Sequence, residues 1–542
     1  MRNEEKDRRV RPGWPRPALA ALSGVLAGFT ALAVAEPVAA AVRPQSGPVI
    51  AVGGASIDAT PTAVKDWAIR HFGTDDKLVL QLGILAVLTL LALALGVLAL
   101  RYRRVGAAGV LLFGAVGAAA AVSRPDSTGP VDALPSVVGA VAGALLLYVL
   151  VGRLTAAGRS AAPASDSAEE TGDGLFVPAG WDRRGFVIAA ASAAAASAAV
   201  GTVGRTLTTS RGQDAIAARE KVVLPSPGSP ARPLPGGAGL RIPGLSPFVT
   251  PNAEFYRVDT ALVVPRVDAT AWRLRIHGKG VQRPGSYSFD DLLRRELVER
   301  DITLTCVSNE VGGPYVGTAR WTGVRLADLL AECGVKPPSR GGPADQLVSR
   351  SVDGMTIGSP VEDVMDGRDA LLALGMNGEP LPFDHGFPVR MVVPGLYGFV
   401  SACKWIKDIE LTTFDSYDPY WVKRGWARRA PVKTAARIDT PKPFARPRAG
   451  TVMVAGVAWA QHRGIDKVEV RVDDGPWQEA DLAAEDTRDT WRQWSFPWRS
   501  TKGGHTLTVR ATDRTGAVQT ERRARTVPDG ASGWHSVVVT VD

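Results

Sequence analysis

The 542-residue sequence contains only three cysteines, Cys306, Cys333 and Cys403, and none of them forms a Cys-x-x-Cys pair. A disulfide framework, a zinc ribbon, an attached haem c and thioredoxin-like chemistry therefore lack the cysteines that they require. Histidine is also rare, with six residues in the whole chain. None of the six falls in the long apolar segments described below, which excludes a haem held by paired histidines within a membrane.

Charge and hydrophobicity are distributed unevenly along the chain. The net charge of +9 does not indicate nucleic acid, because Lys and Arg are scattered and several of them flank apolar segments. Before about residue 205 the sequence is dominated by Ala, Leu, Val and Gly, whereas charged residues and tryptophans appear steadily after it. This division predicts a membrane region followed by a globular region of more than one folding unit.

Five segments are long and apolar enough to cross a bilayer as helices, which takes about 20 residues each. They lie at about 18–42, 78–100, 105–122, 134–151 and 185–204. Charged residues are nearly absent within them, so we expect the helices to anchor the protein. A transporter with an attached domain is the alternative, and the lack of polar residues in the spans disfavours it.

Basic residues predict the orientation of these spans, because cytoplasmic ends collect Lys and Arg. The basic stretches are "MRNEEKDRRVRPGWPRP" at the amino terminus, "RYRR" at 101–104 and "WDRR" at 181–184, which fall on one side if every span crosses. We therefore expect a multi-pass protein of the cell membrane whose residues after 205 are extracytoplasmic. "DRRGFVIA" resembles a twin-arginine export signal, but paired arginines also fit a simple helix anchor, and both interpretations stay open.

Three regions are predicted after the membrane part. Residues 206–250 are rich in Pro and Gly and predict a linker without regular structure. Residues 251–438 alternate short strands with short helices, a pattern of α+β type. Residues 439–542 show strands separated by turn residues, which predicts a small β-sandwich.

Cys306 stands at the end of the β-branched run "DITLTCVSNEVGG". Most free cysteines are buried and inert, so this is one interpretation. A thiolate ligand to a metal is the other.

Three motifs carry a resemblance to a known family. They are "TLTCVSNEVGG", "TARWTGVRLADLL" and "LALGMNGEPLPFDHGFPVRMVVPGLYGFVSACKW". They resemble the sulfite oxidase family of molybdenum enzymes over roughly residues 250–540, and the β-sandwich resembles that family's Ig-like dimerisation domain. The resemblance implies a molybdenum–molybdopterin cofactor in the α+β domain and a homodimer formed through the C-terminal domain.

The resemblance also implies roles for individual residues. Cys306 matches the single protein ligand of the metal, while Cys333 and Cys403 do not match the ligand motif and are expected to be structural. Arg257 matches an arginine that faces the substrate, although a solvated surface arginine is the competing interpretation. His385 and Arg390 match cofactor contacts, against the simpler view that the histidine caps a turn and the arginine pairs with Asp384. The other expected cofactor-binding residues are Tyr256, Ser308, Asn309, Gly398 and Lys404, with Gly395 allowing a close approach of the chain.

The implied reaction is a two-electron oxygen-atom transfer, with sulfite or a related sulfur compound as substrate and a separate haem or membrane redox partner for the electrons. Two departures from the family pattern weaken sulfite as the substrate: Glu310 and Val311 stand where the family has arginines, and Trp426 stands nearest to its substrate-pocket tyrosine, with Tyr420 a few residues earlier. Reduction of oxidised methionine in envelope proteins is therefore an alternative, and a metal-free, membrane-tethered binding module is another.

Overall fold

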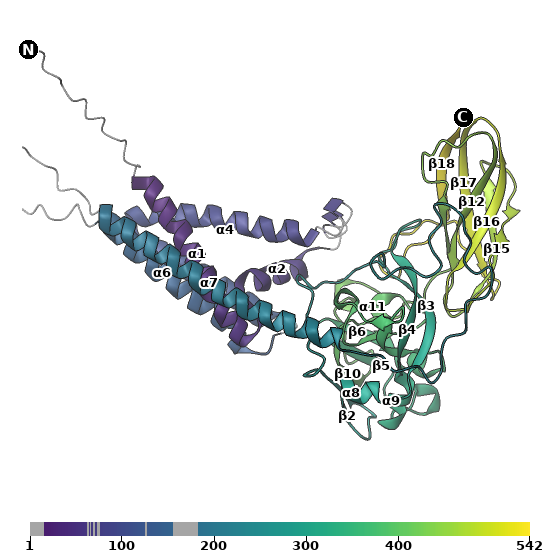
Figure 1. Cartoon of the computed structure of the whole chain (residues 1–542), viewed down its shortest axis with the longest axis horizontal. Helices are drawn as coiled ribbons and strands as arrows, with labels where there is room; N and C mark the ends of the chain where they lie inside the picture. The colour runs from purple at the N-terminus through teal and green to yellow at the C-terminus, as the bar shows by residue number, and fades with distance from the viewer. Residues whose placement is uncertain are drawn as a thin grey trace, which may run out of the picture. The chain divides into compact units, whose positions relative to one another are not determined.

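The structure is a computed structural model that describes residues 16–61, 64, 67–68, 71–72, 76–124, 127–155 and 183–542. It divides into two compact units, Met1–Gly212 and Gln213–Asp542, and each is considered by itself (Figure 1). Most of the predicted basic amino terminus, and Trp181 and Asp182 of the "WDRR" stretch, lie outside the described residues.

The first unit consists of helices. They are α1 (Arg16–Val42), η1 (Pro44–Ser46), α2 (Pro48–Ala59), α4 (Asp76–Arg101), α5 (Arg103–Ser123), η3 (Pro130–Ala133), α6 (Leu134–Thr155) and α7 (Arg183–Glu220), whose last residues, from Gln213, belong to the second unit. Five helices among the described residues are long and apolar enough to cross a membrane, in agreement with the five predicted spans. They indicate a multi-pass membrane protein. The short apolar helix α2 was not expected from the sequence.

Small residues let these helices approach one another closely, as is usual in membranes. A Cβ at Gly143 of α6 would lie 2.7 Å from the carbonyl oxygen of Ala27 in α1, and one at Gly24 of α1 would overlap the backbone of Ala92 in α4. Together with Gly201 of α7, which lies against Ala33, these contacts make α4 and α6 antiparallel to α1 and α7 parallel to it.

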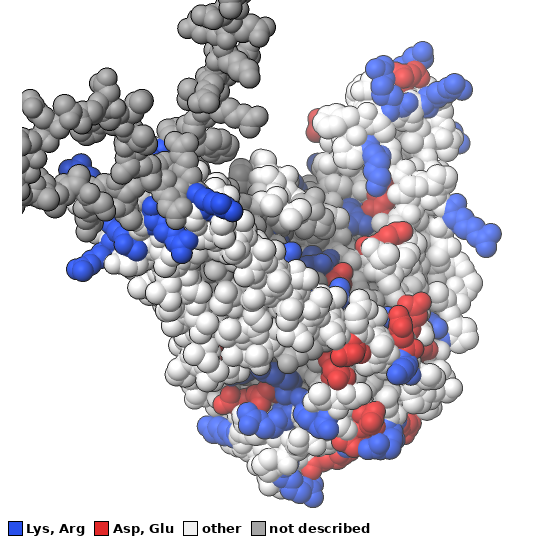
Figure 2. Space-filling view, turned by 60° about the vertical axis from the view of Figure 1, so that its left-hand side comes forward, with Lys and Arg blue, Asp and Glu red and all other residues white. Residues whose placement is uncertain are grey.

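This arrangement gathers six basic helix-end residues on one side of the bundle. They are Arg16, Arg101, Arg103, Arg104, Arg153 and Arg184. Arg43, Lys77 and Arg124 lie at the other side, where Asp132 pairs with Arg43 and Asp58 with Arg124. Figure 2 shows Lys and Arg side chains along one edge of a broad surface that carries no charged side chains. The charge asymmetry that the sequence predicts is therefore present in the folded helices.

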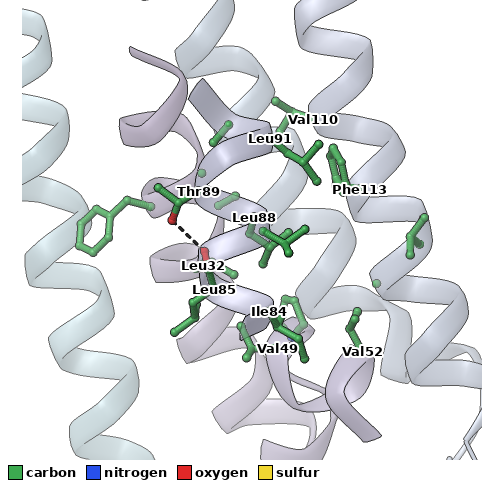
Figure 3. A pocket seen from close by; sticks show the side chains of 18 of the residues that line it. Leu32, Val49, Val52, Ile84, Leu85, Leu88, Thr89, Leu91, Val110 and Phe113 are labelled. Atoms are coloured by element: carbon green, nitrogen blue, oxygen red, sulfur yellow. Dashed lines mark hydrogen bonds between the residues drawn. The ribbon is translucent and has the colours of Figure 1, made fainter. Parts of the chain in front are cut away.

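A cavity of about 890 Å³ lies between α1, α2, α4, α5 and α6 (Figure 3). Its lining is apolar except for Thr89 and Ser136, and the Thr89 hydroxyl donates to the carbonyl oxygen of Leu85 (2.8 Å). The described residues that line it include no ionisable side chain, so this part of the bundle offers no charged path across a membrane.

The second unit begins with an α+β region built on two sheets. One sheet has the order β2-β1-β10-β5-β6 and the other β3-β4-β7-β8, with β9 beside β7. The strands are β1 (Arg273–Gly278), β2 (Gly285–Ser288), β3 (Val298–Thr305), β4 (Val316–Arg325), β5 (Gln346–Ser351), β6 (Thr356–Pro360), β7 (Leu371–Met376), β8 (Glu379–Pro380), β9 (Arg390–Val392) and β10 (Ile406–Thr412). The short helices are α8 (Phe289–Leu293), η5 (Pro338–Arg340), α9 (Leu326–Glu332), α10 (Val361–Met365), η6 (Phe383–His385), α11 (Gly398–Ser401) and η7 (Val422–Arg424). One buried core, which includes Leu304, Trp321 and Phe387, joins the two sheets.

The C-terminal part consists of two four-stranded sheets, β11-β12-β16-β15 and β14-β13-β17-β18. Their strands are β11 (Ala435–Thr440), β12 (Gly450–Trp459), β13 (Ile465–Val472), β14 (Gln478–Glu479), β15 (Asp481–Leu482), β16 (Arg492–Ser500), β17 (Gly503–Asp513) and β18 (His535–Val541). Val454 and Trp494 of one sheet and Val468 and Val509 of the other share a buried core. The predicted β-sandwich is confirmed, and dimerisation through it stays a prediction.

Two predicted boundaries need correction. Strand β11 begins at Ala435, so the C-terminal domain starts before residue 439. The predicted linker 206–250 is wrong as a segment without regular structure, because α7 continues to Glu220. The rest of it packs on the globular unit: Ser229 exchanges backbone hydrogen bonds with β3, and Ala238 and Phe248 are buried in the core. Proline and glycine prevented further helix but did not prevent packing.

Phe248 provides a test of this packing. It is 5% exposed, and its carbonyl oxygen accepts a hydrogen bond from the indole of Trp491 (2.9 Å). We expect Phe248→Ala to lower the free energy of unfolding of the globular unit by about 3–5 kcal/mol, because a buried aromatic ring is replaced by a cavity. Thermal unfolding of the solubilised chain, followed by tryptophan fluorescence, measures the effect.

Leu234→Ala is the matched control, since Leu234 lies in the same segment and is 41% exposed. If the two variants unfold at the same temperature, the segment is a loose linker after all.

Candidate active site

Cys306 lies directly after β3, where the chain leaves the sheet and turns back toward β4. Its amide donates to the carbonyl oxygen of Tyr315 (3.0 Å), and its carbonyl oxygen accepts from the amide of Asn309 (3.0 Å). The side-chain oxygen of Asn309 in turn accepts from the Tyr315 amide (2.8 Å). These hydrogen bonds close residues 306–315, the Cys306 loop, on themselves.

The Cys306 thiol is buried, and burial raises its pKa. The Ser308 amide, which donates to the sulfur (3.4 Å), and the positive charge of Lys404 act in the opposite direction. A thiolate at this position therefore needs a further positive charge, of the kind that a bound metal cation supplies. The described residues contain no group of three or more His, Cys, Asp or Glu side chains placed to hold a metal.

Arg390, the first residue of β9, is a buried cation. Its Nη1 donates to the carbonyl oxygen of His385 (3.2 Å), and its guanidinium lies 4.9 Å from the ring centre of Trp321. Its Nε is buried and has no hydrogen-bond partner in the described structure. Burial lowers the pKa of Arg390 to about 10, so it stays charged at neutral pH. A buried donor of this kind is expected to have a partner, and an anionic ligand group fits.

His385 is held in a defined tautomer. Its Nε2 lies 3.0 Å from the carbonyl oxygen of Asn252, which only accepts, so this nitrogen carries the hydrogen. Burial, helped by the charge of Arg390, lowers the pKa of His385 to about 4. The ring is therefore neutral at pH 7 and leaves Nδ1 as an acceptor. This hydrogen bond joins the His385 side chain to Asn252, which is far away in the sequence. It therefore does not support the alternative in which His385 caps a turn.

Aromatic rings form one wall of the same region. Phe255 stacks on Tyr256 (5.1 Å between ring centres) and meets His385 and Trp321 edge to face (5.5 and 5.8 Å). Burial and the nearby Cys306 sulfur raise the pKa of Tyr256 well above its ordinary value, so its phenol stays protonated. The structure thus brings Tyr256, Cys306, His385 and Arg390 close to one another, while their roles at a cofactor stay a prediction.

Arg257 and Lys404 are held by acidic partners. The carboxylate of Asp259 accepts from Arg257 Nε (3.2 Å) and from Lys404 Nζ (2.6 Å), and Lys404 also donates to the carbonyl oxygen of Asp384 (3.0 Å). The second ion pair of Arg257 is with the side chain of Asp384 (3.5 Å), so the sequence alternative in which Arg390 pairs with Asp384 is wrong. Asp259 was missed by sequence reasoning, although it stands only two residues after Arg257.

Gly398 and Gly395 differ in how strictly their positions require glycine. Gly398 opens the short helix α11, and a Cβ there would meet only ordinary contacts, 3.7 Å from Ala402 and 3.8 Å from the carbonyl oxygen of Thr305. Nothing in the protein therefore forbids a side chain at Gly398, whereas Gly395 has a φ of +83° and lies against His462. The cofactor role of Gly398 stays a prediction.

The remaining cysteines lie in core positions. Cys333 is buried at the end of α9, 3.5 Å from the Tyr287 hydroxyl. Burial raises the pKa of Cys403 to about 12, so it stays a neutral thiol. Both positions agree with the structural role expected for them.

Trp426 adds a second buried donor without a partner in the described structure, its indole Nε1. Its ring lies 5.5 Å from that of Phe399 in α11, which follows Gly398 directly. The position that the sequence placed near the substrate pocket is therefore beside α11. Glu310, by contrast, is exposed on the Cys306 loop.

Comparisons with known proteins identify relatives of this part of the chain. Residues 261–421 match the family model described as an oxidoreductase molybdopterin binding domain. Mitochondrial sulfite oxidase of Rattus norvegicus is 31% identical over 292 residues, which are 46% of this chain and 53% of that protein. NADH nitrate reductase 1 of Oryza sativa subsp. japonica is 35% identical over 199 residues, 32% of this chain and 21% of that one. The sulfane dehydrogenase SoxCD of Paracoccus pantotrophus, a crystal structure, aligns with a TM-score of 0.47 and 24% identity, over 54% of this chain and 84% of that chain.

The chain spans about half the length of the sulfite oxidases it matches. The matched region contains Cys306, His385, Arg390 and Lys404, while Tyr256 and Arg257 immediately precede it. The chain therefore carries a molybdopterin oxidoreductase domain homologous to sulfite oxidase and nitrate reductase.

Proposed function

We propose that the protein is a membrane-anchored molybdenum–molybdopterin enzyme that transfers an oxygen atom to or from a sulfur compound in a two-electron reaction. The observation that carries the proposal is the buried guanidinium of Arg390, whose Nε has no partner in the described structure and which lies beside the neutral His385. A buried cation with a free donor is unfavourable unless an anionic group binds there.

The residues present are suited to the cofactor. Arg390 would donate to an anionic group of the pterin, and the free Nδ1 of His385 would accept from one of its N–H groups. Cys306 would supply the protein sulfur to the metal, and Ser308 and Asn309 would fix the direction of that sulfur. Lys404 and Gly398 are further cofactor contacts in this proposal.

When bound, the molybdenum–pterin group supplies the two-electron chemistry. The protein contributes position and charge. The protonated phenol of Tyr256 is available to donate, and Phe255 and Trp321 exclude water from one side of Arg390. Arg257 would bind an oxygen of the substrate at the partly exposed edge of the site.

The charge balance bears on the substrate. Asp259 accepts hydrogen bonds from both Arg257 and Lys404, and Asp384 pairs with Arg257 as well. A dianion such as sulfite gains less from cations that already have acidic partners. This compensation favours a second candidate, reduction of a neutral sulfoxide such as oxidised methionine, beside oxidation of sulfite or a related compound. Assays with dye-linked sulfite oxidation and methionine sulfoxide reduction distinguish the two.

The basic helix ends support a cytoplasmic location for the start of α7 and an extracytoplasmic location for the globular unit. A separate haem protein or membrane redox partner would exchange the electrons. The twin-arginine role of Arg183 and Arg184, the Ig-like character of the sandwich and a homodimer through it are parts of the same proposal.

Cys306→Ser tests the metal ligand. We expect the purified protein to contain molybdenum when it is made in a host that synthesises the cofactor. We expect the variant to lose turnover at least about a hundredfold, because loss of a residue that only supports a metal ligand already lowers activity by up to about a hundredfold. Metal analysis and dye-linked assays measure the two effects, with Cys333→Ala as the control cysteine. Full turnover in Cys306→Ser would contradict the role of this cysteine as the metal ligand. A wild-type protein without molybdenum would contradict the proposed enzyme and favour a metal-free binding module.

Asp259→Asn tests the charge compensation. The variant keeps an oxygen that accepts a hydrogen bond from Lys404, but it removes the negative charge. We therefore expect KM for sulfite to fall about tenfold at low salt. The effect is of this size because one unit charge near the site changes the binding free energy of an anion by a few kcal/mol at most. The effect should shrink as ionic strength rises.

Asp418→Asn is the matched control, because it makes the same change of charge in an exposed pair with Arg428. An equal KM in the Asp259 variant and the wild type would show that Asp259 does not set the charge that the substrate meets.

A further inference from the structure

The C-terminal domain contacts the Cys306 loop directly. The ring of His535, at the start of β18, lies so close to Gly312 that a Cβ there would overlap it. Gly312 also has a φ of +81°, so both its backbone and its neighbour favour glycine. Arg437 of β11 donates through Nη1 to the carbonyl oxygen of Gly313 (2.8 Å).

Arg437 is fixed at each of its nitrogens. Its Nε donates to Asp439 (2.6 Å), and its Nη2 donates to the hydroxyl of Ser246 (3.0 Å). Asp439 is itself held by the amide of Ser246 (3.0 Å). Arg437 is 7% exposed and Asp439 is 3% exposed, so the pair is desolvated and rigid. The loop carbonyl at Gly313 is therefore bound to a fixed donor.

His535 is fixed in the same way. Its Nδ1 accepts a hydrogen bond from the backbone amide of Ile438 (3.0 Å), which lies between the residues of the Arg437–Asp439 pair. The charged groups that face it are Arg437, Arg523 and Asp439, and burial with the two arginines lowers the pKa of His535 to about 4. The ring is neutral at pH 7 and can keep its bond to Ile438.

The C-terminal domain also forms hydrogen bonds with β3, the strand that leads to Cys306. The amide of Thr303 in β3 donates to the carbonyl oxygen of Asp489 (2.9 Å). The side chain of Gln461 donates to the carbonyl oxygen of Thr303 (3.1 Å) and to the hydroxyl of Thr305 (2.8 Å). The C-terminal domain thus holds the chain on both sides of the cysteine.

We propose that Arg437 and His535 are positioning residues, which hold the Cys306 loop so that the sulfur keeps one direction toward the metal. This inference rests on the proposed function of Cys306 and gives the C-terminal domain a role within one chain, beyond association of two chains. A displacement of about 1 Å at a reacting centre costs about a hundredfold in rate, so a small movement of the loop has a large effect.

Hydrogen–deuterium exchange of the full-length protein tests the contact without relying on activity. In Arg437→Ala and His535→Leu we expect the amides of residues 306–316 to exchange about tenfold faster, because each variant removes one buried contact of the loop. Arg437→Lys and His535→Asn should restore much of the protection, since lysine keeps a donor and the asparagine oxygen replaces Nδ1. Arg446→Ala is the control, an exposed pair with Asp542 in the same domain.

The loaded enzyme provides the second measurement. We expect both disruptive variants to keep their molybdenum, to lower kcat while KM stays within about twofold, and to change the electron paramagnetic resonance spectrum of the half-reduced metal. Unchanged exchange of the loop, or exchange that rises equally over the whole C-terminal domain, would overturn the inference. A wild-type protein without molybdenum would defeat the proposed function, while the exchange experiment on the same protein still decides the role of Arg437 and His535.

Discussion

The globular unit is organised around a positive charge that has been removed from water. Arg390 is fully buried, yet it keeps its proton because burial lowers its pKa only to about 10. The carbonyl oxygen of His385 and the face of Trp321 compensate part of the cost, and the Nε donor is left over. A buried donor in this state is expected to bind a further group. Burial is also the main reason why His385 is neutral and Tyr256 protonated: it lowers the pKa of His385, with help from the charge of Arg390, and it raises the pKa of Tyr256, with help from Cys306.

The helical unit obeys a different constraint. Glycine and alanine occupy the closest contacts between its helices, beside a few large buried side chains such as Leu147 and Leu150. One ion pair, between Arg43 and Asp132 (2.9 Å), is buried where α6 begins, and the hydroxyl of Ser127 and the amide of Thr128 donate to the same carboxylate. This cluster lies beside the loop between α5 and η3, so it closes the bundle at its end without placing a charge in the apolar middle.

Sequence patterns predicted a structural element correctly where a single local pattern determines that element. The five spans follow from length and hydropathy, and the sandwich follows from alternation with turn residues. Segment 221–250 could not be predicted, because Phe248 and Ala238 are buried by residues far along the chain, such as Trp491. Motif similarity assigned Cys306, His385 and Arg390 to the candidate site. It could not show that Asp259 joins Arg257 to Lys404, since ion pairing depends on where distant side chains meet in space.

The C-terminal domain contacts the Cys306 loop from outside. A turn such as residues 306–315 can close on itself, but closure fixes only its internal shape. Its orientation requires contacts from outside, and Arg437 supplies one from a strand whose own position is set by the sandwich core. Because Arg437, Asp439 and Ser246 share one desolvated network, moving any of them costs the hydrogen bonds of the others. The β-sandwich thereby restricts the position of the Cys306 sulfur through two groups of the contact, the Gly313 carbonyl and the His535 ring.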